Sequence, residues 1–301
     1  MGKRPLNAGF IQGFDVVSCL LGVPRLIIEA RSILTGLTMP LIQLANDEWV
    51  FPDDDAAAEN EFDEILESFH AGDLVAAERL LKQFTSRNPT HIDAWQHLAL
   101  VLERTERATE AFLCCREAVR LGTESFPIEF SWITSKLMWG FLENRPFLRA
   151  YHNLGLWFQR RGQIDAAIEV FVRLLSTSPQ DNLGVRYLLP ELWLEKGDLL
   201  SVVRHCKQCD DDVFPEITYT YPLALILLNE IEKARPMLTA AKRSLPLVAK
   251  ELLKKRHSQP STAMPGHITL GGADQAYEYW VRFGKYWHKN APAMQLLAEK
   301  L

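Results

Sequence analysis

Cysteine is scarce in this sequence, with five among 301 residues. An odd number without regular spacing argues against the disulfide framework of a small secreted protein. Cys206 and Cys209 form a Cys-x-x-Cys pair, but tetrahedral zinc needs about four ligands, and no βαβ pattern accompanies the pair as in redox motifs. In the repeat described below both fall on core positions, as Cys115 does, where cysteine packs as a small hydrophobic residue. We therefore expect neither a metal nor another cofactor.

The sequence also lacks a basic excess. Its formal net charge is −5 and its pI is about 5.9, whereas nucleic-acid-binding domains normally carry a surplus of Lys and Arg. The aromatic residues could stack on bases, but most of them fall on core positions of the repeat. We therefore expect a protein partner and no nucleic acid. A hydrophobic content of 48% and a charged content of 24% are typical of a globular chain.

Catalytic signatures are missing as well. The sequence contains no Gly-x-Ser-x-Gly elbow, no His-Glu-x-x-His pair and no P-loop. Its eight histidines are scattered along the chain, and a structural or surface role is expected for each. The chain is thus predicted not to be an enzyme, with a catalytic or metal-binding protein of unrecognised type kept as an alternative.

No apolar run is long enough to cross a bilayer. Residues 16–44 are apolar, but Arg25, Glu29 and Arg31 interrupt them, and a span needs about 20 nearly uncharged residues. Asp15 falls inside the apolar stretch that a signal peptide would need. We expect two helices over residues 1–50 that pack on the protein, and a cytoplasmic location. Peripheral membrane binding by residues 14–45 remains an alternative function.

What the sequence does contain is an internal repeat. Residues 149–179 place small, aromatic and turn residues in a fixed order: Tyr151, Leu154, Gly155, Phe158, Gly162, Ala167, Phe171 and Pro179. Gly155 and Ala167 are small enough for two antiparallel helices to approach closely. Gly162 suits a helix end, and Pro179 cannot continue a helix.

The same order recurs along the chain. Ala77 and Ala111 are 34 residues apart, and Ala111 and Ala167 are 56 apart, which is the same period plus an insertion of 22 residues. We place this aromatic-rich insertion at residues 123–144. A fourth repeat contains Gly197, and a fifth, more degenerate one ends near Pro246.

The order and the period of 34 residues resemble the tetratricopeptide repeat family, over about residues 58–250, and the chain is similar to uncharacterised bacterial members. The resemblance implies an all-α, right-handed superhelical solenoid of antiparallel helix pairs with extra N- and C-terminal helices. The predicted organisation is an N-terminal helical segment and acidic linker (1–57), the repeat array (58–250), and a loop with capping helices (251–301).

The resemblance also implies a concave surface that binds partner proteins. We therefore predict an interaction scaffold or adaptor that holds an unidentified protein or peptide, with oligomeric state open. Arg149 and Asn153 partly match the clamp with which some family members hold acidic chaperone tails, but the set is incomplete. The partner-binding candidates are the expected exposed positions of the inner helices: Gln96, Glu103, Arg104, Arg149, His152, Asn153, Arg160, Tyr187 and Glu191.

Overall fold

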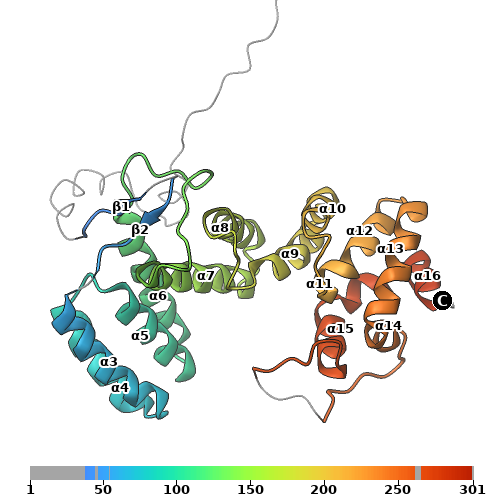
Figure 1. Cartoon of the computed structure of the whole chain (residues 1–301). Coiled ribbons are helices and arrows are strands. Elements are labelled where there is room, and N and C mark those ends of the chain that lie inside the picture. Colours follow the sequence, from blue (N-terminus) through green and yellow to red (C-terminus); the bar gives the residue numbers. More distant parts are fainter. Residues whose placement is uncertain (1–37, 45–46, 54, 262–265, 300–301) are drawn as a thin grey trace, which may run out of the picture.

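A computed structural model describes residues 38–44, 47–53, 55–261 and 266–299, and these residues are mainly helical (Figure 1). Helix pairs follow one another along an open array. The first part of the array contains α3 Ala56–His70, α4 Leu74–Arg87, α5 Ile92–Arg104, α6 Ala108–Glu124, α7 Arg145–Arg160 and α8 Ile164–Thr177. The second part contains α9 Leu189–Lys196, α10 Leu199–Gln208, α11 Pro215–Thr218, α12 Thr220–Leu227 and α13 Ile231–Ser244. Three further helices are α14 Pro246–Leu252, α15 Ala273–His288 and α16 Ala291–Ala298. The predicted all-α solenoid is confirmed.

The turns inside the helix pairs share one backbone conformation, although the sequences of the repeats differ. Gly72, Gly162 and Gly197 all have a positive φ, between 69° and 81°. Glu106 and Asn229 occupy the equivalent turns with φ values of 61° and 63°. Glycine and asparagine accept this left-handed conformation readily, whereas glutamate does so at a cost. The backbone conformation is therefore conserved from pair to pair even where the glycine is replaced.

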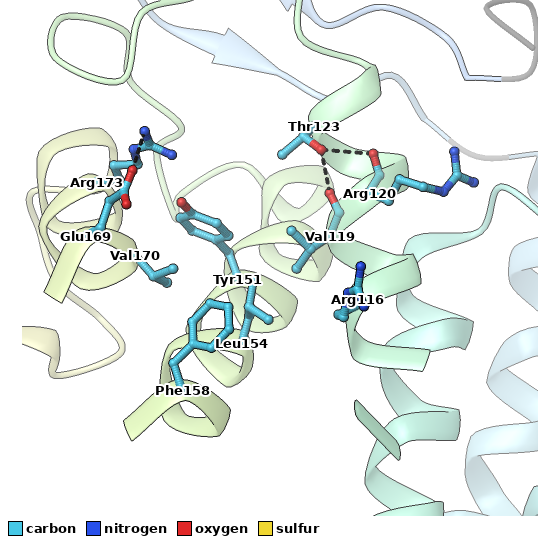
Figure 2. A pocket seen from close by; sticks show the side chains of 10 residues that line it. All are labelled: Arg116, Val119, Arg120, Thr123, Tyr151, Leu154, Phe158, Glu169, Val170 and Arg173. Atoms are coloured by element: carbon cyan, nitrogen blue, oxygen red, sulfur yellow. Dashed lines mark hydrogen bonds and ion pairs between the residues drawn. The ribbon is translucent and has the colours of Figure 1, made fainter. Parts of the chain in front are cut away.

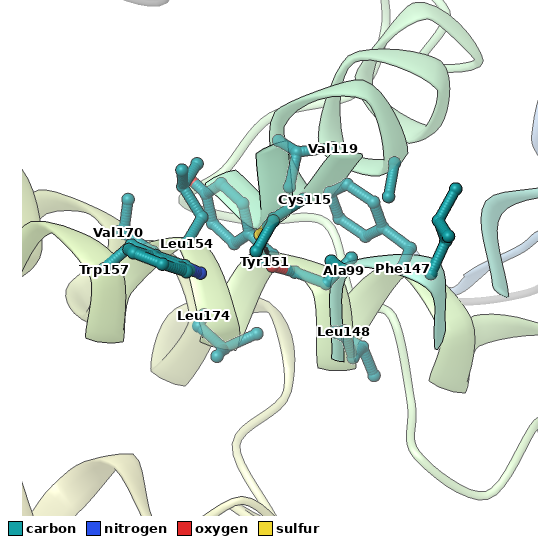
Figure 3. Packing of buried hydrophobic residues seen from close by; sticks show 14 of the residues in the cluster. Ala99, Cys115, Val119, Phe147, Leu148, Tyr151, Leu154, Trp157, Val170 and Leu174 are labelled. Atoms are coloured by element: carbon teal, nitrogen blue, oxygen red, sulfur yellow. Dashed lines mark hydrogen bonds between the residues drawn. The ribbon is translucent and has the colours of Figure 1, made fainter. Parts of the chain in front are cut away.

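The α7–α8 pair packs as the small residues of the repeat predict. Phe171 and Ala167 are fully buried, and a Cβ atom placed on Gly155 would lie 2.4 Å from Cε1 of Phe171. Figure 3 shows Leu154 and Trp157 of α7 beside Val170 and Leu174 of α8 in this core. Gly155 is thus the point at which the two helices come closest.

Two hydrophobic clusters form the core of the described chain, and they meet in α9. Leu192 belongs to the first cluster and Leu194 to the second, while Trp193 packs against both. This helix of 8 residues thus contributes side chains to both clusters.

Residues 38–44 and 47–53 contain a pair of short strands, which we call the N-terminal hairpin, and not the expected helix. Strands β1 Ile42–Gln43 and β2 Trp49–Val50 pair in antiparallel fashion. The backbone N–H of Trp49 donates to the carbonyl of Lys136, and that of Lys136 donates to Asp47, both at 2.8 Å. These residues adopt an extended conformation and not a helix because the insertion supplies hydrogen-bond partners for their backbone groups. The rest of the two-helix prediction, residues 1–37, lies outside the described residues.

The insertion, which also contains the 3-10 helix η1 Leu142–Asn144, is a compact aromatic cluster. The helix α6 extends to Glu124, so the irregular part begins at Ser125. Phe126 stacks on Phe130 with ring centroids 4.1 Å apart, and Trp132 stacks on Tyr151 of α7 at 5.0 Å. The aromatic residues of the insertion therefore pack against the array.

The acidic run over residues 52–67 is linker only at its start, because α3 begins at Ala56. The Asp55 side chain caps this helix by accepting from the N–H groups of Ala57 and Ala58. Within the described ranges, no helix combines the length and the apolar character needed to cross a bilayer.

Candidate functional site

The first helices of the second and third pairs, α5 and α7, lie side by side and are joined by two ion pairs. Arg149 Nη2 lies 2.7 Å from Asp93 Oδ2, and Arg160 pairs with Glu103. These partners are 56 and 57 positions apart, so residues of α5 face those about 56 positions later in α7. Gln96 thereby falls at the level of His152. We call these six residues the α5–α7 seam: Asp93, Gln96, Glu103, Arg149, His152 and Arg160.

The seam holds a set of buried polar atoms that lack partners. Gln96 Oε1, Arg149 Nε and His152 Nε2 have no hydrogen-bond partner among the described residues, whereas Asp93 Oδ1 lies 3.3 Å from His97 Nδ1. Buried polar groups in folded proteins are nearly always paired, because leaving one unpaired costs about 1–3 kcal/mol. Three such atoms on two facing helices therefore indicate a site that a ligand or water completes.

The seam has an ion pair at each end and a neutral imidazole between them. Burial raises the pKa of Asp93, but the hydrogen bond from His97 and the charges of His97 and Arg149 outweigh it, so its pKa lies below its ordinary value. Burial lowers the pKa of His152 to about 4. His152 is therefore a neutral imidazole at physiological pH, able to donate or accept one hydrogen bond.

The buried His152 makes stability depend on pH. Its pKa is about 4 in the folded state and near 6.5 when unfolded, so the unfolded state binds the proton more tightly. The contribution of neutral His152 to stability is present above pH 6.5 and falls by about 3 kcal/mol as the pH drops to 4. Urea unfolding of wild type and His152→Gln across this window checks the effect, which the variant should lack. Equal pH slopes for both proteins would contradict it, and His70→Gln serves as an exposed control.

The structure places the predicted site residues in three different surroundings. Gln96 was expected to be exposed, but only 1% of it is accessible; it lies one turn after Asp93, which pairs with Arg149 of α7. Arg104 is exposed, with its guanidinium 4.4 Å from the centre of the Phe69 ring. Asn153 is half-buried beside His152. Arg149 and Arg160 keep accessible side chains despite their ion pairs.

Tyr187 and Glu191 do not line an open surface, because α15 covers them. Arg282 of α15 donates from Nε to Glu191 Oε2 and from Nη2 to the Tyr187 carbonyl, both at 2.8 Å. It also donates to Glu216 at 3.2 Å. Tyr187 belongs to the 3-10 helix η2 Val185–Tyr187, and its hydroxyl donates to Asp212. The repeat frame could not predict this contact, since α15 lies outside the repeats.

The sequence reasoning also missed a cavity of about 40 Å³ between α6, α7 and α8 (Figure 2). Its floor is apolar and its rim is mostly charged. The floor comprises Val119, Tyr151, Leu154, Phe158 and Val170, and the rim comprises Arg116, Arg120, Thr123, Glu169 and Arg173. The cavity lies where the insertion joins α6 to α7, beside Trp132. It has room for one small apolar side chain.

The cysteines are placed largely as the repeat predicts. Cys115 and Cys206 are buried in the core, whereas Cys209 is only half-buried at the end of α10. Burial raises the pKa of Cys115 to about 12 and that of Cys114 to about 11, so both are neutral thiols at neutral pH and poor nucleophiles. In the part of the chain that is described, no three His, Cys, Asp or Glu side chains gather as metal ligands would.

Comparison with known proteins gives one family match, to the family described as "Tcf25: Transcriptional repressor TCF25", over residues 57–300. No curated protein matches the chain. Among solved structures, a tetratricopeptide repeat protein from Parabacteroides merdae ATCC 43184 is 13% identical, covers 80% of this chain and 78% of its own, and has a TM-score of 0.50.

Two further solved structures are similar. YrrB, described as a TPR protein with an unusual peptide-binding site, is 15% identical over 63% of this chain and 87% of its own, with a TM-score of 0.48. MamA is 15% identical over 66% of this chain and 98% of its own, with a TM-score of 0.47. Identities this low concern the fold alone, and of these three structures the Parabacteroides protein is the one similar enough to support it. The resemblance to tetratricopeptide proteins is thus confirmed for the fold, while the family match is a different one.

Proposed function

This chain belongs to the TCF25 family, described as transcriptional repressors, and we propose that it is a non-catalytic scaffold that holds a segment of a partner protein against the α5–α7 seam. The family description and the helical-repeat fold both favour a scaffold over an enzyme. The partner's identity is not part of the proposal.

The observation that carries this proposal is the row of unpaired polar atoms in the seam. Gln96 Oε1 is an acceptor, Arg149 Nε is a donor, and neutral His152 Nε2 can be either. An extended peptide offers the complementary set, since its backbone alternates N–H donors and C=O acceptors. Arg149 and Asn153 are partly accessible, so their polar side chains can contact a segment that lies along the seam. Binding of main-chain groups in a groove is an established mode of peptide recognition.

The proposed contact surface contains fewer residues than the sequence predicted. Tyr187 and Glu191 lie beneath α15, so they are left out of the proposed contact surface. Glu103, Arg104 and Arg160 extend the seam at the other end of the two helices. Because Glu103 and Arg160 neutralise each other, this end favours a polar segment without a strong charge of one sign.

A substitution of Gln96 tests the proposal, because stability and binding should change in opposite directions. Gln96→Leu removes a buried acceptor that lacks a partner, so we expect the free energy of unfolding to rise by about 1 kcal/mol. The same change removes a contact to the partner, so capture from a lysate of the source organism should fall at least about fivefold. Thermal melting and affinity capture with mass spectrometry measure the two effects.

The matched control is Gln208→Leu, which changes an exposed glutamine at the end of α10. It should leave both melting and capture unchanged. A Gln96→Leu protein that captures the same partners as wild type would exclude the seam as the binding site. A variant that melts lower than wild type would show that Gln96 is satisfied in the free protein.

The family description supports a partner that acts in transcription. The four described cysteines are free thiols, which fits a reducing compartment, whether the expected cytoplasm or the nucleus. Fluorescence imaging of the tagged full chain in its own organism distinguishes the two. A nuclear signal would support a transcription-related partner, and an exclusively cytoplasmic signal would support the expectation from the sequence alone.

A further inference from the structure

The charge of this chain is distributed very unevenly. Residues 231–301 carry 12 Lys and Arg against 5 Asp and Glu, a formal charge of +7, whereas residues 1–230 carry 21 against 33, a formal charge of −12. The expectation of no nucleic-acid partner rested on the net charge of the whole chain and on the core positions of most aromatic residues. The C-terminal part alone has the basic excess that a polyanion-binding surface needs.

Structure brings the basic residues of this part together. The loop after α14 carries Lys254, Lys255 and Arg256, and its first residues lie against the end of α15, where His288 pairs with the Leu252 carbonyl at 2.8 Å. The rings of His257 and His288 are 6.1 Å apart. We call this surface the basic face, and its exposed members are Lys250, Lys254, Lys255, Arg256, His288 and Lys289.

Buried contacts hold the basic face in place. Glu251, only 4% accessible, accepts from His257 Nδ1 at 2.9 Å and pairs with Lys254. The His257 ring stacks on Trp280 of α15 with centroids 3.7 Å apart and planes 7° apart. Glu251 is occupied by these contacts. Among the described residues, no ion pair involves Lys255, Arg256 or Lys289.

We propose that the basic face binds a single-stranded nucleic acid through its phosphates. Lysines predominate there, and lysine is a mobile point charge that suits spaced phosphates, whereas the arginine fork suits the paired oxygens of a carboxylate. Aromatic side chains of α15 lie beside the loop that carries Lys254 and Lys255, since His257 of this loop stacks on Trp280, and the Trp280 ring is 5.5 Å from that of Tyr277. Cations beside aromatic rings are the usual composition of a single-strand binding surface. The proposal is independent of the seam, which lies on other helices.

The test uses a fluorescein-labelled 20-nucleotide oligouridine RNA and fluorescence anisotropy with the full chain. We expect a triple variant, Lys255→Glu, Arg256→Glu and Lys289→Glu, to bind at least about tenfold more weakly than wild type in low salt. Loss of three phosphate contacts should also make the dependence of log affinity on log salt shallower by about 2. The control is Arg79→Glu, Arg204→Glu and Lys207→Glu, which changes the net charge equally at exposed sites elsewhere.

Wild-type binding that the control retains and the triple variant loses supports the proposal. Equal weakening by both variants overturns it, because the effect would then arise from net charge alone. Displacement of the RNA by poly-glutamate as efficiently as by unlabelled RNA also overturns it in favour of an acidic protein segment. Absence of binding to the oligouridine in low salt overturns it outright. Circular dichroism confirms that both variants are folded.

Discussion

Replacing Gly155 with leucine is expected to lower the free energy of unfolding by about 3 kcal/mol or more. A Cβ atom at this position would lie 2.4, 2.8 and 2.9 Å from three atoms of the Phe171 ring, and real Cβ atoms do not approach so closely. Phe171 is fully buried and cannot turn aside, so α7 and α8 must separate. Overpacking of a core typically costs about 1–3 kcal/mol and occasionally more, and a leucine adds three carbons beyond the clashing Cβ.

Thermal melting and urea unfolding measure the effect, with Gly140→Leu as the matched control. A Cβ on Gly140, which is exposed in the insertion, would meet nothing within 4 Å. The control should therefore melt within about 2 °C of wild type. An unchanged midpoint for Gly155→Leu would refute the placement of Gly155 at the helix contact.

The second large effect is expected at Asn144, which attaches the N-terminal hairpin to the insertion. This side chain is fully buried. Its Oδ1 accepts from the Phe51 N–H at 3.1 Å, and its Nδ2 donates to the carbonyls of Trp49 at 3.1 Å and Met138 at 3.2 Å. Asn144→Ala leaves three backbone groups unpaired at about 1–3 kcal/mol each, with water entering to relieve part of the cost. We expect a net loss of about 3 kcal/mol.

Hydrogen exchange followed by mass spectrometry locates this loss. Amides of residues 47–53 should exchange much faster in Asn144→Ala than in wild type, while those of α10 to α13 should keep their protection. Asn182→Ala, at an exposed asparagine, controls for the loss of an amide as such. If the hairpin amides stayed protected, the aromatic contacts of Trp49 and Phe51 would have to hold the hairpin unaided.

The repeat was predictable because a short-range rule sets it. Close helix packing needs a small residue, and a tight turn needs a residue that accepts a positive φ, so both recur at fixed spacing. Gly155, Ala167 and the glycine turns were therefore identified from spacing alone. The turn at Asn229 fits the same rule, since asparagine is the residue that most often replaces glycine in this conformation.

The strands and the burial of Gln96 could not be predicted, because they depend on contacts between segments that are distant in the sequence. Nothing local in residues 42–50 indicates strands, since their partners are Lys136 and Asn144 of the insertion. Gln96 occupies a position that faces solvent on an isolated helix, and the neighbouring α7 buries it. The pairing of Asp93 with Arg149 does leave one trace in the sequence, because opposite charges stand 56 residues apart at the same place in successive repeats.

The division of the core within α9 has a consequence for how the protein opens. In repeat arrays, stability is the sum of each unit and its contact with the next, and cooperative units can unfold separately. Leu192 anchors one cluster and Leu194 the other, with two peptide bonds between them. The two halves of the array can therefore unfold as separate units that are joined at α9. The seam lies in the first half and the basic face in the second. Unfolding of one half would therefore leave the binding surface of the other half intact.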